Sequence, residues 1–397
     1  MLSQVLALGF TQTIAWAAST YLIAILAAPI ARDLDLSTSS VFGAFSVALV
    51  VMGLAGPAAG RAIDRLGGRG VLAVSDLVLA LGLVVLGFAS NAATLFGAWC
   101  VLGLGMALGL YDAAFATLVR IHGAQARSPI TGITLIAGFA STVGWPVTAL
   151  ITGHYGWRAS CFAWAAILVF VCLPINLACI PKASARAKDA TPTPADEAAA
   201  AAASSPRARS DYRRAFALLV IFGATTAFVT SAMAAHLPGL LLAVGTTAVA
   251  ALAASALLGP AQVAARLLEF LAARRFHFHP LLTARIATAF HPMAGTLLAF
   301  AGGPAAVASL FSVLHGAGNG MITIAKGTLP LAIFGAVGYG HRQGLLSMLG
   351  RAMQAIAPFT FGLVMEFHGP RIALGLSVGL SVVALLSLMA LRQSESG

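Results

Sequence analysis

Charged side chains are scarce in this sequence. Only 9% of its 397 residues are Asp, Glu, Lys or Arg, whereas 59% are hydrophobic. Soluble domains carry about 25% charged residues. The scarcity therefore excludes an ordinary soluble domain and indicates a chain that crosses a membrane many times.

Sequence signatures of catalysis are also missing. There is no Walker loop, no nucleophile elbow and no cluster of His and Cys at metal-ligand spacing, so we predict a protein that is not an enzyme and has no cofactor or metal. His277 and His279 lie beside two arginines and are interpreted as interfacial residues. All four cysteines fall inside apolar runs, where Cys behaves as a small hydrophobic residue: Cys100, Cys161, Cys172 and Cys179.

The net charge of +11 does not indicate nucleic-acid binding. Aromatic residues are not interleaved with the basic ones, and the positive charges collect in short segments between apolar runs. Such clustering reports membrane topology, because cytoplasmic loops carry an excess of Lys and Arg. It predicts that both termini and the central segment are cytoplasmic.

The apolar runs predict about twelve membrane helices, since about 20 apolar residues cross a bilayer core. The first run lacks a basic start and is expected to be a retained helix, not a cleaved signal peptide. The predicted segments are 4–30, 38–62, 70–90, 93–121, 129–152, 158–180, 213–237, 246–271, 280–301, 305–333, 342–366 and 370–391.

Composition divides the chain into two halves. Residues 182–212 are rich in Pro, Ala, Ser and charge without an apolar period, so we predict a flexible cytoplasmic linker between bundles at 1–181 and 213–397. The halves also resemble repeats at a nearly constant offset. The residues that match are Phe10 with Phe222, Gly103 with Gly316, and Pro146 with Pro358.

A charged, glycine-rich turn follows the second segment. It reads Gly60-Arg-Ala-Ile-Asp64-Arg65-Leu-Gly67-Gly68-Arg69 and must lie at a membrane surface. This spacing resembles the signature between helices 2 and 3 of the major facilitator superfamily (MFS). The resemblance implies an all-α membrane fold with two pseudo-symmetric six-helix bundles. It also implies a small-molecule transporter whose substrate binds at the interface of the two repeats.

The resemblance implies a gating role for the turn. Asp64 is expected to face the start of segment eleven, where unpaired helix amides stabilise a carboxylate. An ordinary loop carboxylate neutralised by Arg61 or Arg65 is the alternative.

Ionisable and polar residues inside apolar segments are functional candidates, because they are costly in hydrocarbon. Asp112 is the candidate for proton coupling; the alternative is a structural partner for an Arg or a helix end. In the family, segments one, four, seven and ten line the cavity. The cavity candidates are Gln12, Trp16, Thr20, Tyr21, Tyr111, Thr226, Thr230, His315, Asn319, Thr323, Lys326, Arg351 and Gln354.

Two departures from the family limit the functional prediction. An Arg that many proton-coupled members carry in segment four is replaced here by Trp99, and the glycine-rich pattern of antiporters is degenerate between Gly138 and Pro146. We expect a monomeric, proton-coupled secondary transporter of the inner membrane, with export favoured. A carrier of organic anions or an uptake symporter is the alternative, and a membrane sensor is disfavoured because no sizeable soluble domain is present.

Overall fold

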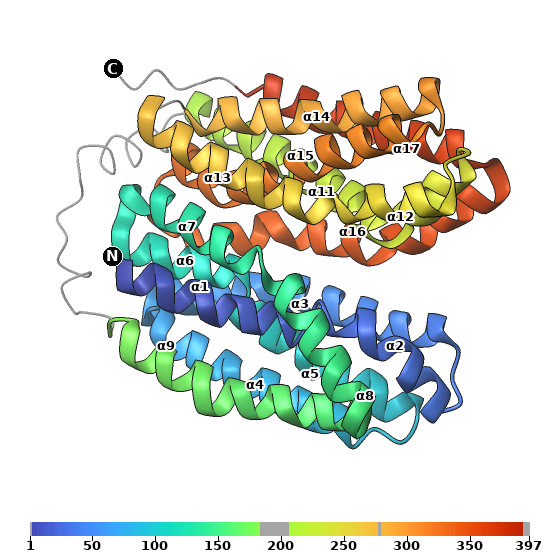
Figure 1. Ribbon diagram of the computed structural model, residues 1–397. Coiled ribbons are helices and arrows are strands. Elements are labelled where there is room, and N and C mark those ends of the chain that lie inside the picture. The colour runs from blue at the N-terminus through green and yellow to red at the C-terminus, as the bar shows by residue number, and fades with distance from the viewer. Residues whose placement is uncertain (1, 183–205, 277–278, 392–397) are drawn as a thin grey trace. The chain divides into compact units, whose positions relative to one another are not determined.

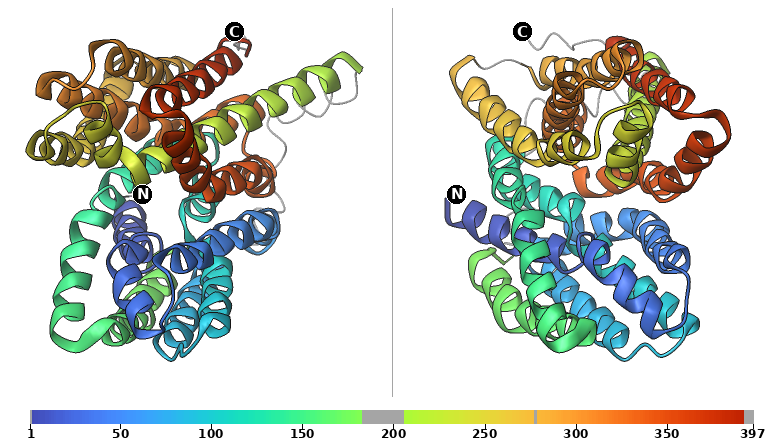
Figure 2. Two further views of the ribbon diagram at one scale, coloured as in Figure 1. Left: turned by 90° about the vertical axis from the view of Figure 1, so that its right-hand side faces the viewer. Right: turned by 45° about the vertical axis from the view of Figure 1, so that its right-hand side comes forward.

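The computed structural model describes residues 2–182, 206–276 and 279–391, and all regular secondary structure in these ranges is helical (Figure 1). Two compact units form, Met1–Ala190 with Gly338–Met348 and Thr191–Val337 with Leu349–Gly397. Within each unit the long helices lie side by side (Figure 2).

The first unit contains helices α1 to α9 and the first residues of α16. The bounds are α1 Leu2–Ala17, α2 Leu22–Asp33, α3 Thr38–Leu66, α4 Gly68–Gly87, α5 Ala92–Gly109, α6 Tyr111–His122, the 3₁₀ turn η1 Gly123–Ala126, α7 Arg127–Ala137, α8 Ala140–Ile167, the π-helical turn η2 Leu168–Cys172 and α9 Leu173–Cys179.

The second unit contains the remaining helices. The bounds are α11 Pro206–Ala243, α12 Ala248–Ala256, α13 Leu258–Phe276, α14 Pro280–Ala301, α15 Ala305–Phe334, α16 Tyr339–His368 and α17 Pro370–Met389.

Nine helical runs in the described ranges are long and apolar enough to cross a membrane. One of them, Ala92–Cys179, joins three of the predicted segments into a single run. The less apolar α14 matches the predicted segment 280–301. The nine runs together with α14 therefore account for all the predicted segments.

Glycine marks the tight turns between predicted segments. Gly67 has φ of 85° and is the single residue between α3 and α4. Gly156, also with φ of 85°, breaks α8 between predicted segments 129–152 and 158–180. Residues with a Cβ rarely adopt this left-handed region, so glycine lets each chain reverse within a residue or two.

The predicted linker lies largely outside the described residues, which resume at Pro206. There α11 begins, whereas the sequence predicted a helical segment only from 213. Residues 206–212 are therefore helical and not part of an irregular linker. Proline is favoured in the first turn of a helix, because its missing N–H has no partner there in any case.

Paired glycines show the internal repeat at the level of packing. A Cβ on Gly103 of α5 would lie 2.5 Å from the carbonyl oxygen of Ala48 in α3, and one on Gly316 of α15 would lie 2.6 Å from that of Leu258 in α13. In both halves the fourth predicted segment thus contacts the backbone of the second. Small residues allow such close approach between membrane helices.

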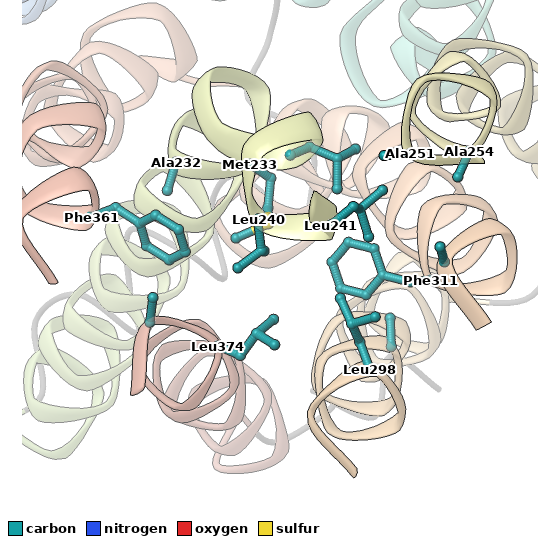
Figure 3. Packing of buried hydrophobic residues seen from close by; sticks show 14 of the residues in the cluster. Ala232, Met233, Leu240, Leu241, Ala251, Ala254, Leu298, Phe311, Phe361 and Leu374 are labelled. Atoms are coloured by element: carbon teal, nitrogen blue, oxygen red, sulfur yellow. The ribbon is translucent and has the colours of Figure 1, made fainter. Parts of the chain in front are cut away.

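The second unit has a well-packed apolar core around α11. Figure 3 shows Phe361, Leu374 and Phe311 converging on Leu240 from three other helices. Phe311, Phe361 and Leu240 are at most 2% exposed. Lipid is as apolar as these side chains, so tight van der Waals packing supplies most of the association.

Candidate functional site

Asp64 holds the start of α16. It lies in the last turn of α3, and its two carboxylate oxygens accept hydrogen bonds from the backbone N–H groups of Gly340 at 2.9 Å and His341 at 2.8 Å. The first N–H groups of a helix have no partner within the helix, and the helix dipole favours a negative charge beside them. The sequence predicted that Asp64 faces this helix end, and these contacts lie within the first unit.

Close backbone contact between α3 and α16 supports this arrangement. A Cβ on Gly60 would lie 1.9 Å from the carbonyl oxygen of Gly340, and one on Gly344 would lie 2.5 Å from the backbone of Gly56. Both distances are far shorter than any van der Waals contact. Glycine at these positions is therefore what permits the helices to approach each other.

The rest of the turn contacts α6 through a hydrogen bond and close packing. The Arg120 guanidinium donates to the backbone carbonyl of Asp64, and a Cβ on Gly68 would lie 2.0 Å from the Thr117 hydroxyl oxygen. Arg65 is exposed and Arg69 is half-buried. The turn is thus packed between α6 and the start of α16.

Asp112 makes a second contact with the start of α16. The helix breaks at Leu110, so Asp112 lies in the first turn of α6 and not in the middle of a span. Its Oδ1 accepts hydrogen bonds from Gln343 Nε2 and Ser347 Oγ, each at 3.0 Å. Asp112 also borders a small cavity lined by Gly56, Gly60, Ala107, Ala113, Gly340 and Gly344. These contacts correspond to the structural alternative for Asp112, a partner for a helix end.

Helix α1 and the turn that follows it contain buried polar atoms without a hydrogen-bond partner. Gln12 Oε1, Trp16 Nε1 and the Thr20 hydroxyl are buried and have no hydrogen-bond partner among the described residues. Gln12 Nε2 donates to the carbonyl oxygen of Gly109 at 2.5 Å. Because buried polar groups are nearly always paired, this polar face of α1 is a candidate ligand surface.

Two aromatic rings lie close to Trp16. The ring of Trp16 lies 4.9 Å from that of Tyr111 and 6.0 Å from that of Tyr21, centroid to centroid. Three of the predicted candidates, Trp16, Tyr21 and Tyr111, therefore lie close together.

The polar stripe predicted on α15 is not brought together on one surface. His315 stacks on His291 of α14 with ring centroids 4.4 Å apart. Asn319 Oδ1 accepts from Thr230 Oγ1 of α11 at 3.1 Å, and Thr323 Oγ1 accepts from Arg266 of α13 at 3.4 Å. Three members of the stripe thus face three different helices.

The remaining candidates of the second unit lie on α11, α15 and α16. Thr226 donates to the backbone of its own helix at 2.7 Å. Arg351 is half-buried and donates to Gln354 Oε1 at 3.0 Å. Lys326 is half-buried on α15.

Sequence reasoning missed several buried polar residues. Asp76 of α4 and Asn176 of α9 are joined by a hydrogen bond of 2.8 Å and are at most 4% exposed. His291 of α14 is also buried, and its ring stacks on that of His315. The rule that ionisable residues in apolar segments are functional candidates would have found Asp76, which lies inside the predicted segment 70–90.

No group of three potential metal ligands occurs among the described residues. His277, one of the two interfacial histidines, lies outside them.

Two compact helical units, nine long apolar runs among the described residues and a charged glycine turn after the second of them define a polytopic membrane protein. The chain belongs to the Major Facilitator Superfamily, whose family model matches residues 8–358.

One curated relative shares 31% identity over 155 residues, which is 38% of this chain and 40% of the relative. It is an uncharacterized 38 kDa protein in a 23S RNA operon of Thermoproteus tenax. The chain thus spans less than half of that relative's length.

Solved structures share the fold across almost the whole chain. The human organic anion transporter MFSD10 (TETRAN) aligns with a TM-score of 0.73 and 16% identity, covering 97% of this chain and 99% of that one. The proton:xylose symporter XylE gives 0.75 and 15%, covering 97% and 94%. The E. coli fucose:proton symporter FucP gives 0.68 and 16%, covering 98% of each chain. These similarities establish the fold.

Proposed function

We propose that this protein is a monomeric secondary active transporter that moves a small organic compound across the inner membrane by alternating access, with its termini in the cytoplasm. The observation that carries the proposal is the polar face of α1, where the buried atoms Gln12 Oε1 and Trp16 Nε1 have no hydrogen-bond partner among the described residues. An unsatisfied buried polar group costs about 1–3 kcal/mol. A bound compound that pairs with these groups would offset this cost.

Coupling to protons is part of the proposal, and Asp112 is the candidate that the sequence supplies. Its carboxylate accepts hydrogen bonds from two side chains of α16. Proton binding at Asp112 would weaken both bonds, because hydrogen bonds to charged groups are about twice as strong as neutral ones.

Asp64 is proposed to act as the cytoplasmic gate. Its two hydrogen bonds close the start of α16 onto the turn after α3, and they must break if α16 moves away during transport. We expect Asp64→Asn to slow transport while the protein remains in the membrane. A matched control is Asp33→Asn, which removes an exposed ion pair with Arg158. Wild-type transport rates in Asp64→Asn would contradict the gating role.

Export of an amphipathic compound is favoured by the aromatic rings around α1. The test compares cells that overexpress the wild type, cells that overexpress Asp64→Asn, and cells in which the gene is deleted, on a panel of toxic compounds. An exporter raises tolerance to its substrates, whereas an uptake symporter lowers it. Identical sensitivity of all three strains across the panel would contradict the export proposal.

An organic-anion carrier is the second candidate, and the half-buried cations Arg351 and Lys326 favour it. A surplus of positive charge in a cavity attracts anions. Replacing Arg351 with Ala and Trp16 with Ala separates the two candidates. Loss of transport only in Arg351→Ala supports the anion carrier, and loss only in Trp16→Ala supports the exporter of amphipathic compounds.

A further inference from the structure

Asp76 lies midway along α4 and is 4% exposed. Its Oδ2 accepts a hydrogen bond from Asn176 Nδ2 at 2.8 Å. The same amide accepts from the Thr11 hydroxyl at 3.2 Å through its Oδ1. A chain of three buried side chains therefore links α4 through α9 to α1.

The helices around Asp76 carry other charged and titratable side chains. The elements that pack against α4 are α3, α5, α6, α8, η2 and α9. Their charged and titratable side chains are Arg61, Asp64 and Arg65; Cys100; Tyr111, Asp112, Arg120 and His122; His154, Tyr155, Arg158 and Cys161; Cys172; and Cys179.

Among the described residues, no Lys or Arg forms an ion pair with Asp76. Ionised carboxylates within a membrane segment are costly, and they normally pair or face a proton or ion pathway. Binding a proton removes that cost without any partner residue.

The orientation of Asn176 favours a proton over a metal cation. Hard cations require several oxygen ligands. The group that faces Asp76 is the amide nitrogen, a donor, because the amide oxygen accepts from Thr11. A cation at this place would therefore meet the amide nitrogen of Asn176 and not its oxygen.

We propose that the Asp76 carboxyl is a proton-binding site that couples proton movement to ligand binding on α1. The proton comes from water and returns to water, and no other bond changes. Thr11 immediately precedes Gln12, whose Oε1 is one of the unpartnered groups of the ligand face. Protonation converts the Asn176–Asp76 bond from a charge-assisted to a neutral one, which is about half as strong, and so loosens the chain that holds α1. This proposal rests on the proposed function, in which α1 binds the ligand.

Infrared difference spectroscopy tests the proposal on the full chain in lipid vesicles. The C=O stretching band of a neutral carboxylic acid is followed while the buffer pH is varied. We expect this band to titrate in the wild type and in Asp112→Asn, and its Asp76 component to be lost in Asp76→Asn. Asn176→Leu is expected to shift the frequency of the band, because the amide donates to this carboxyl. These measurements need no substrate.

Wild-type and Asp76→Asn difference spectra that coincide over the whole pH range would overturn the proposal. So would loss of the band on adding sodium chloride at constant pH, since it would identify a cation site. A failed toxic-compound screen with an intact Asp76 titration would instead refute the proposed export function while leaving proton binding at this carboxyl in place.

Discussion

Replacing Asp64 with Asn tests how strongly one carboxylate holds the start of α16. The carboxylate accepts from both Gly340 and His341, whereas an amide offers one acceptor oxygen and turns an NH₂ group toward the other N–H. A hydrogen bond to a charged group contributes about 1.5–3 kcal/mol. Each 1.4 kcal/mol corresponds to about a tenfold change in an equilibrium constant, so opening of this helix end should become about 10-fold to about 100-fold more frequent.

Amide hydrogen exchange measured by mass spectrometry reads out this opening. Exchange rates report local opening equilibria, and peptides covering residues 338–348 contain both amides. Exchange of these peptides should accelerate by that factor in Asp64→Asn and stay unchanged in Asp33→Asn, whose ion pair with Arg158 is exposed. Equal exchange in the wild type and Asp64→Asn would refute the reasoning that the charge of the carboxylate holds the helix.

Three further substitutions test packing and capping, each measured by thermal unfolding in detergent. Gly60→Ala should destabilise the protein by about 1–3 kcal/mol, because its Cβ would lie 1.9 Å from a backbone oxygen, whereas Gly70→Ala meets nothing within 4 Å and should have no such cost. Phe311→Ala should lower the unfolding temperature and Phe300→Ala should not, since their exposed fractions are 2% and 89%. Asn91→Ala should cost about 0.5–2 kcal/mol, because Asn91 closes a capping box at the start of α5; an unchanged unfolding temperature would contradict that cap.

The helical segments were predictable because each depends on a continuous apolar stretch. A run of about 20 such residues suffices to identify a span, and the charged turn at Gly60–Arg69 occurs where the family resemblance requires it. Breaks within runs were not predictable in the same way. The interruption at Leu110 depends on backbone conformation there, and it moves Asp112 from the expected interior of a helix to a helix start.

The contacts of the predicted cavity residues depend on which helices pack beside them. The stripe on α15 satisfies helical spacing, yet its members bind partners on three other helices. Spacing along one helix identifies residues of a common side, but it does not say which neighbouring helix each of them meets. The rule for ionisable residues in apolar segments covers Asp76, but its partner Asn176 could not be predicted, because it is distant in the sequence.

By itself, the sequence determined that the chain spans a membrane in two similar halves. It also placed Asp64 in a turn that resembles the family signature, because hydrophobic length and glycine spacing are local properties. Only the tertiary structure decided which polar groups are paired: that Asp64 and Asp112 both bind the start of α16, that α1 retains unpartnered atoms, and that Asp76 is linked to Thr11. Hydrogen bonds between distant segments depend on the packing of whole helices, and no local pattern specifies that packing.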